Sequence, residues 1–221
     1  MGADEGYFGE RVAAVYDEHS AGMFDPAVVG PAVEMLAERG PRVVGIDSSE
    51  AMLARLREKP GAERIEAMVG DMAATRVDGE FSLVYLVFNT IFNLTTQDGQ
   101  VACFENAAAH LEPGGCFVVE VGVPGLRSLP PGATLRAFDV SDTHVGVDEY
   151  DVANQGLVSH HLTLVEGEWV RLSIPFRSVW PSELDLMARI AGMRPRERWS
   201  DWKREPFTSE STRHVSVWEK A

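Results

Sequence analysis

Cysteine, basic residues and long apolar runs are all scarce in this chain of 221 residues. Cys103 and Cys116 are its only cysteines, and their spacing does not suggest a metal site. No apolar run approaches the ~20 residues that cross a bilayer, and the first ten residues lack the basic and apolar parts of a signal peptide. These absences predict a cytoplasmic protein in a reducing compartment, with no membrane partner and no bound metal.

Positive charge is also in deficit, since 20 Lys and Arg face 34 Asp and Glu, for a net charge of -14 and a pI near 4.8. Nucleic-acid affinity comes largely from Lys and Arg contacts to phosphates, so a nucleic-acid partner is not expected. Hydrophobic residues make up 45% of the chain, which is enough to bury a core. The length favours a single domain.

Strand and helix patterns alternate through the first half of the chain. Apolar strands that end at acidic or polar residues are followed by capped helical patterns, and Thr95 or Thr96 can cap the longest helix. The expected elements are a strand at 42–47, a helix at 51–57, strands at 65–69 and 81–88, a helix at 97–111 and a strand at 116–121. This order predicts an α/β fold with an open, mainly parallel sheet flanked by helices.

The pattern changes after Gly122, where prolines mark a loop and segments that alternate apolar and polar residues follow. Residues 158–165 and 169–176, separated by a turn at Gly167, predict an antiparallel pair inserted after the last parallel strand. Ser182 is expected to cap a helix through Ile190, with Asp185 in a capping-box position. A final strand is expected at 214–218.

Three polar sites follow the apolar strands, where a ligand of an open α/β sheet would lie. Asp47 can accept the two hydroxyls of a ribose, although an acid before a helix is also favoured by the helix dipole. The triplet Gly70-Asp71-Met72 offers a carboxylate and an apolar side chain, and as an isolated triplet it also fits a simple turn. Asn89, after Phe88, fits either a cleft floor or a strand-ending turn.

This arrangement, closed by Leu111-Glu112-Pro113-Gly114-Gly115, resembles the small-molecule class I S-adenosylmethionine-dependent methyltransferases. The resemblance implies a Rossmann-like fold, with residues 1–40 as a helical lid, 41–121 as the cofactor-binding core, 122–179 as an antiparallel cover, and 180–221 as a C-terminal helix and strands. It also implies a cofactor site for S-adenosylmethionine. The implied contacts are Tyr16, Asp47, Ser48, Met52, Asp71, Met72, Phe88 and Asn89.

The family's first strand and its glycine-rich GxGxG turn have no counterpart in this sequence. Only three residues, 39–41, separate the helical pattern at 25–38 from the strand at 42–47, and no GxGxG occurs anywhere in the chain. Either the printed sequence omits a segment of roughly 25 residues, or the chain carries a true deletion. Omission is favoured because the flanking residues match the family closely, and a break in the Cα trace is then expected between Met35 and Pro41.

The resemblance implies methyl transfer to an N, O or C nucleophile of a small molecule. His144, His160 and His161 are candidate bases in the inserted segment, and at most one of the adjacent pair can face the cleft. Two alternatives stay open, namely a non-catalytic methyltransferase-like binding protein and a nicotinamide-dependent oxidoreductase. A homodimer is compatible with the sequence but is not indicated by it.

Overall fold

The computed structural model describes residue 9 and residues 42–221. Its first unit is a short strand-helix-strand crossover. The elements are β1 (Val43–Asp47), α3 (Glu50–Arg57), η1 (Ala62–Arg64) and β2 (Ile65–Val69). β1 and β2 pair in parallel, as the sequence predicts, and Ser49 caps α3 by accepting a hydrogen bond from the Met52 amide at 3.2 Å.

A second, larger sheet of four strands carries the main core. Its order is β3-β4-β10-β9, with β3 and β4 parallel and β10 antiparallel to both of its neighbours. The strands are β3 (Phe81–Leu86), β4 (Leu111–Gly122), β9 (Met193–Trp199) and β10 (Arg213–Lys220), and the helical elements are η2 (Thr90–Asn93), α4 (Gln97–His110) and α5 (Pro181–Ile190).

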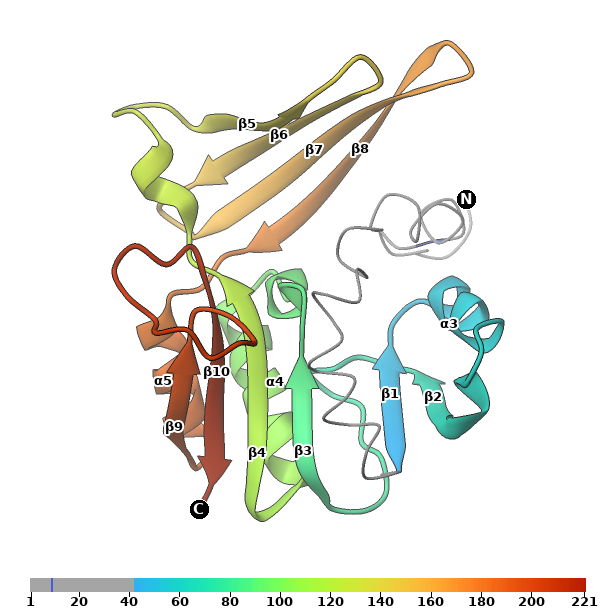
Figure 1. Cartoon of the computed structure of the whole chain (residues 1–221), viewed down its shortest axis with the longest axis vertical. Coiled ribbons are helices and arrows are strands. Elements are labelled where there is room, and N and C mark those ends of the chain that lie inside the picture. Colours follow the sequence, from blue (N-terminus) through green and yellow to red (C-terminus); the bar gives the residue numbers. More distant parts are fainter. Residues whose placement is uncertain (1–8, 10–41) are drawn as a thin grey trace.

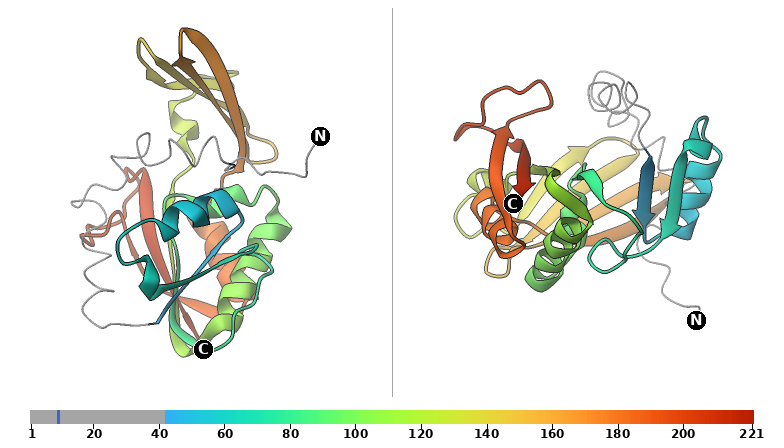
Figure 2. Two further views of the ribbon diagram at one scale, coloured as in Figure 1. Left: turned by 90° about the vertical axis from the view of Figure 1, so that its right-hand side faces the viewer. Right: turned by 90° about the horizontal axis from the view of Figure 1, so that it is seen from below.

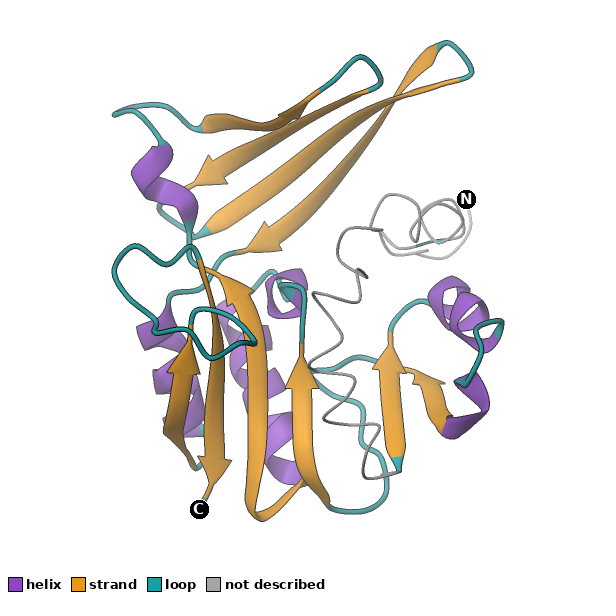
Figure 3. Ribbon diagram, in the orientation of Figure 1, coloured by secondary structure: helices purple, strands orange, loops and turns teal. Residues whose placement is uncertain are grey.

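Helices α4 and α5 cover one face of this sheet (Figure 3). Phe117 and Trp218 from the strands pack with Phe104 of α4 and Met187 of α5 in the largest buried cluster. Successive residues of β4 point to opposite faces of the sheet, as in any pleated strand. Val118, next to Phe117, therefore lies on the other face, in a separate buried cluster. No helix within residues 42–221 is long and apolar enough to cross a membrane.

The inserted segment forms an antiparallel sheet that stands over the end of the core toward which β1, β3 and β4 point (Figure 1). It follows η3 (Gly125–Ser128), and its order is β5-β6-β7-β8. The strands are β5 (Leu135–Val140), β6 (His144–Asp151), β7 (Gly156–Val165) and β8 (Glu168–Arg177). The predicted pair is β7 and β8, and its turn lies at Glu166 and Gly167, both with positive φ.

Within residues 42–221, no backbone hydrogen bonds pair β1 with β3, so the parallel strands belong to two separate sheets. Each of these strands has a hydrogen-bonded neighbour on one side only, β2 for β1 and β4 for β3. All five residues of β1 are only half-buried, whereas an interior parallel strand is normally covered on both faces. The described fold is therefore divided between β1 and β3.

One local prediction is wrong. Ser182 does not cap α5, because the helix begins at Pro181 and its N-cap is Trp180, with no side-chain cap bond. The Asp185 carboxylate instead accepts hydrogen bonds from Arg198 at 2.6 Å and from the Trp218 indole at 2.9 Å. The amides of Glu183 and Leu184 donate to the Trp180 carbonyl at 3.0 and 3.1 Å, so the first turn of the helix is held without a side-chain cap.

Three further predictions lie outside the described residues. They are the helical lid of residues 1–40, the role of Tyr16, and the break expected between Met35 and Pro41.

Candidate functional site

The carboxyl ends of β1 and β2 bring Asp47 and the Gly70-Asp71-Met72 turn together. Asp47 is paired with Val69 in the parallel register, and the Gly70 amide donates to the Asp47 carbonyl oxygen at 2.9 Å. Asp71 follows immediately, so the two acids end adjacent strands at one edge of one sheet. This juxtaposition is the one that the strand order predicts.

Asp47 is half-buried, and its side chain is already oriented by the backbone. One carboxylate oxygen accepts from the Ser49 amide at 2.8 Å, at the start of α3. The neighbouring Ser48 is exposed and Met52 is half-buried on α3. A carboxylate held in this way can accept hydroxyl groups from a ligand at the sheet edge.

The Gly70-Asp71-Met72 turn is fixed from several sides. The Asp71 carboxylate accepts from the Ala73 amide at 2.8 Å, and its own amide donates to the Thr75 hydroxyl at 2.8 Å. The buried Asn106 of α4 donates to the Met72 carbonyl at 2.8 Å. A Cβ at position 70 would overlap Thr75, so glycine is required here. The Asp71 side chain remains exposed at the edge.

Cys103 lies near this turn but does not offer a nucleophile. Burial, with a further contribution from the charge of Asp71, raises the pKa of the Cys103 thiol to about 12. The thiolate is the reactive form of cysteine, so this side chain acts as a core residue.

The turn after β3 holds two consecutive residues in the left-handed region. Phe88 has φ 54° and Asn89 has φ 60°. Asn tolerates this conformation, whereas Phe does so at a cost of roughly 1–3 kcal/mol, and such strain clusters at functional sites. The Asn89 side-chain oxygen accepts from the Gly122 amide at 2.6 Å, which ties the turn to the end of β4.

Glu120 is a buried acid beside the turn after β3, and the sequence did not predict its place there. It is 9% exposed on β4, and its carboxylate accepts from the Phe88 amide at 3.4 Å. Its signal in the sequence is a single acid within the apolar run Phe117-Val118-Val119-Glu120-Val121. Asn106 was missed for a different reason, because nothing in a helical pattern reveals a tertiary bond to a distant turn.

The three candidate histidines lie on the β5–β8 sheet, on two faces. His144 and His161 share one face, and their rings are joined by a 3.1 Å contact between Nε2 and Nδ1. His160 points to the opposite face, where it contacts Glu149 at 3.0 Å and Ser173 at 2.8 Å. The alternation along β7 agrees with the expectation for adjacent strand residues.

The residues at the carboxyl edge fit one end of a nucleoside-containing cofactor. Asp47 would supply a carboxylate for ribose hydroxyls, and Asp71 with Met72 would supply a polar edge and an apolar face for a base. The chain has no GxGxG turn for the amino-acid end of such a cofactor. These residues therefore fit the nucleoside part of such a cofactor, whereas the chain has no matching turn for its amino-acid part.

Comparison with known proteins points to one family. Residues 29–115 match the family model described as a methyltransferase domain. The chain is 30% identical over 191 residues to the cypemycin N-terminal methyltransferase of a Streptomyces species, covering 84% of this chain and 77% of that protein.

Solved structures of the same kind share the fold. The CcbJ methyltransferase from Streptomyces caelestis aligns with a TM-score of 0.80 and 34% identity, over 99% of both chains. An S-adenosylmethionine-dependent methyltransferase from Clostridium acetobutylicum aligns with a TM-score of 0.72 and 12% identity, over 96% of this chain and 98% of that one.

Proposed function

Because this chain belongs to the class I S-adenosylmethionine-dependent methyltransferases, we propose that it methylates an amine nitrogen of a small polar molecule. The comparisons confirm the methyltransferase family that the sequence predicted, together with the α/β fold and S-adenosylmethionine as the cofactor. Membership of this family excludes the nicotinamide-dependent alternative. The acceptor and the attacked atom are the parts that we propose.

The observation that carries the cofactor assignment is the placement of Asp47 and Asp71 on adjacent parallel strands. The Gly70 amide, which donates to the Asp47 carbonyl, joins the two strand ends that carry these carboxylates. Asp47 would accept the ribose hydroxyls and Asp71 the adenine amino group, while Met72 would pack on the ring. S-adenosylmethionine supplies an electrophilic sulfonium methyl group when it is bound.

The protein's own contribution to such a reaction is alignment and exclusion of water. Glu120 and Gly122 hold the strained Phe88–Asn89 turn, which would form a rigid floor beside the proposed nucleoside site. The β5–β8 sheet stands above this edge (Figure 2) and would cover the acceptor. A covered site strengthens the electrostatic interactions inside it.

Two observations support an amine acceptor. The relative from Streptomyces is named as an N-terminal methyltransferase, and an N-terminus is an amine. The net charge of -14 also attracts cationic amines toward the protein and repels phosphorylated acceptors.

Isothermal titration with S-adenosylmethionine and with S-adenosylhomocysteine tests the cofactor half of the proposal. Turnover is then measured as S-adenosylhomocysteine release with glucosamine, tyramine and Ala-Ala-Ala as amine probes, and with glucose as the oxygen counterpart of glucosamine. We expect cofactor binding and turnover with an amine only. Binding without turnover on any probe would favour the non-catalytic alternative, and no binding would overturn the cofactor site.

A further inference from the structure

Four polar side chains form a continuous chain across one face of the β5–β8 sheet. The Asp139 carboxylate contacts His144 Nδ1 at 2.5 Å, His144 Nε2 contacts His161 Nδ1 at 3.1 Å, and His161 Nε2 contacts the Ser159 hydroxyl at 3.3 Å. The chain crosses three strands, since Asp139 is on β5, His144 on β6, and the other two on β7.

A β-bulge in β5 is what brings Asp139 to this face. The register of β5 against β6 shifts between Ala137 and Asp139, so Phe138 is the extra residue. Without it, Phe138 and Asp139 would alternate to opposite faces; with it, both project toward the histidines. Gly146 completes the arrangement, because a Cβ there would overlap the Phe138 ring.

The Phe138 ring packs beside the two imidazoles. Its ring centroid lies 5.4 Å from His161 and 6.5 Å from His144. The chain of contacts therefore has a half-buried middle and two different ends. Asp139 is 48% exposed at the outer end, and Ser159 is 7% exposed at the inner end.

The face that carries the chain is the one turned toward the core. Ser159 pairs with Asp148 across β6 and β7, and Arg136 and Tyr150 lie on the same face. A Cβ at Gly125 would lie 3.0 Å from Arg136 Nη1 and 3.6 Å from the Tyr150 hydroxyl. Gly125 begins η3, which follows the carboxyl end of β4, so this face meets the chain leaving the cofactor edge (Figure 2).

For two neutral rings, these contacts are satisfied by one tautomer. A carboxylate only accepts, so His144 carries its proton on Nδ1 and its Nε2 is an acceptor. His161 then donates from Nδ1, which leaves Nε2 to accept from Ser159. Asp139 thus sets the direction of every hydrogen bond in the chain, as the acid does in a Ser-His-Asp triad.

We propose that Asp139, His144, His161 and Ser159 form a proton relay that removes the proton released when an amine is methylated. This proposal rests on the proposed amine acceptor. As the N–CH3 bond forms and the S–CH3 bond breaks, the sulfonium electron pair returns to sulfur and the nitrogen becomes an ammonium. Its proton passes to Ser159 Oγ, the serine proton to His161, the His161 Nδ1 proton to His144, and the His144 Nδ1 proton to Asp139 and solvent.

The first test determines the tautomers of His144 and His161 and requires neither substrate nor cofactor. Long-range ¹H–¹⁵N spectra of protein labelled in the histidine rings distinguish the Nδ1–H from the Nε2–H form. We expect His144 and His161 to be Nδ1–H in the unmodified protein. Asp139→Asn should convert both to Nε2–H, because the amide donates to Nδ1 in place of accepting. Nε2–H rings in the unmodified protein would overturn the relay.

The second test measures kcat/KM for methylation of whichever amine the unmodified protein accepts among glucosamine, tyramine and Ala-Ala-Ala. His161→Gln should lower kcat/KM by about 10²-fold or more, the usual contribution of a positioned acid or base. Asp139→Asn should lower kcat/KM as well, because the same substitution converts both histidines to the Nε2–H tautomer. His160→Gln is the matched control, because the same residue type on the same strand points to the opposite face, and it should leave kcat/KM unchanged.

Two further measurements separate the relay from simpler explanations. Gly146→Ala should displace Phe138 and lower kcat/KM with all four relay residues present. Equal melting temperatures for the variants and the unmodified protein rule out a loss through unfolding. Unchanged turnover in His161→Gln would overturn the relay, whereas no turnover of any amine by the unmodified protein would overturn the proposed acceptor and leave the tautomer test decisive for the relay.

Discussion

At the scale of the single residue, Asp47 has a structural role, and the binding role that we propose for it is separable from that one. Its carboxylate accepts from the Ser49 amide at 2.8 Å, which is a structural bond at the start of α3. A carboxylate has acceptor sites for more than one donor, so this bond leaves acceptor capacity toward a ribose. The structural role predicts an effect on stability, and the binding role predicts an effect on affinity.

Asp47→Ala should weaken S-adenosylmethionine binding by about 1–3 kcal/mol, because buried hydroxyls would lose a charged acceptor. Isothermal titration measures the dissociation constant directly. Glu66→Ala is a suitable control, since Glu66 lies on the adjacent β2 and pairs with Arg42 at the surface. An unchanged dissociation constant in Asp47→Ala would remove this residue from the site.

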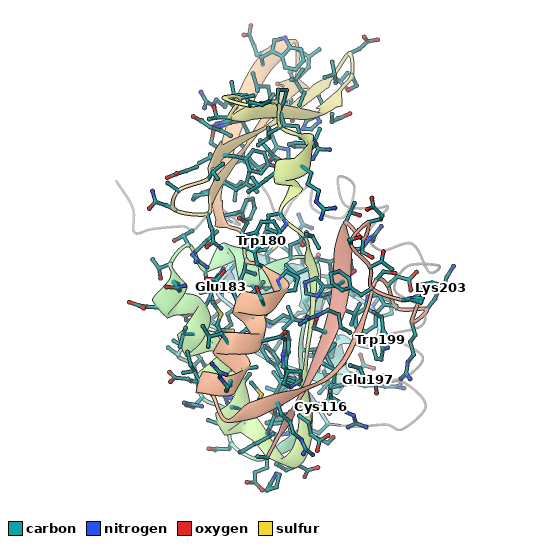
Figure 4. The ribbon with its side chains drawn as sticks, turned by 90° about the vertical axis from the view of Figure 1, so that its left-hand side faces the viewer. Cys116, Trp180, Glu183, Glu197, Trp199 and Lys203 are labelled. Atoms are coloured by element: carbon teal, nitrogen blue, oxygen red, sulfur yellow. The ribbon has the colours of Figure 1, made fainter. Side chains whose placement is uncertain are left out.

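At the scale of elements, a buried polar network joins the β5–β8 sheet to the helices of the core. Arg177, the last residue of β8, donates to Glu183 of α5 at 2.7 Å and also to Gln100 of α4. Gln155, in the β6–β7 turn, donates to the same Glu183 at 2.8 Å. Figure 4 shows Glu183 with Trp180 at this junction. The network anchors the base of the cover to the core.

Glu183→Gln should cost about 3 kcal/mol of unfolding free energy at pH 7, because it leaves the Arg177 charge buried without its partner. The two side chains are only 8% and 13% exposed, so solvent screens the pair weakly. Urea denaturation measures the change. The double variant Arg177→Met with Glu183→Leu should recover most of the loss, and a double variant as unstable as Glu183→Gln would contradict this account of the pair.

The same pair has a defined pH dependence. Desolvation raises the pKa of Glu183, but hydrogen bonds from Gln155, Arg177 and Gln97 outweigh it and lower the pKa below the ordinary 4.5. A depressed folded-state pKa gives stability that is present above 4.5 and is lost as pH falls through the folded value. The Glu183→Gln variant should therefore lose less stability than the unmodified protein on acidification below pH 4.5.

The sequence predicted elements well wherever periodicity and caps were local. The limits of β2 and the cap at Thr96 both match the structure. The strands β5, β6 and β9 were not predicted; β5 carries the bulge at Phe138, and β9 carries a proline and four charged residues. The four-residue relay could not be read from the sequence either, since it depends on the register of three strands and on the bulge.

At the scale of the whole molecule, one buried histidine links global stability to pH. His214 on β10 is fully buried against Phe207 and bonds the Ser216 hydroxyl at 2.8 Å. Burial, with the nearby charge of Arg198, lowers its pKa to about 4, and Asp185 opposes this shift in part. The unfolded chain therefore binds a proton near pH 6.5 that the folded protein does not bind until about pH 4.

Unfolding free energy should accordingly fall by about 3 kcal/mol between pH 6.5 and pH 4 on account of His214. His214→Gln keeps a hydrogen-bonding side chain but does not titrate. Its stability curve should be flatter than that of the unmodified protein in this window and parallel to it above pH 7. Parallel curves throughout the window would contradict the assignment to His214.

The division between β1 and β3 is the largest departure of the whole molecule from a continuous α/β sheet. Each strand has one unpaired edge within residues 42–221, and unpaired edges of parallel strands are normally filled or covered. At the corresponding place in the chain order, before residue 42, the sequence pattern predicts no strand, and the sequence contains no GxGxG turn. A strand lying between β1 and β3 would satisfy both edges and supply the missing turn.

Intact-mass measurement decides whether the protein contains such a strand. We expect a mass above 24.3 kDa by about 2.7 kDa, the weight of a βα unit of roughly 25 residues. A mass of 24.3 kDa would instead establish a true deletion, and weak or absent S-adenosylmethionine binding by titration should accompany it. Tight binding by a protein of 24.3 kDa would show that other backbone contacts the amino-acid end of the cofactor, so the glycine-rich turn would not be needed for affinity in this chain.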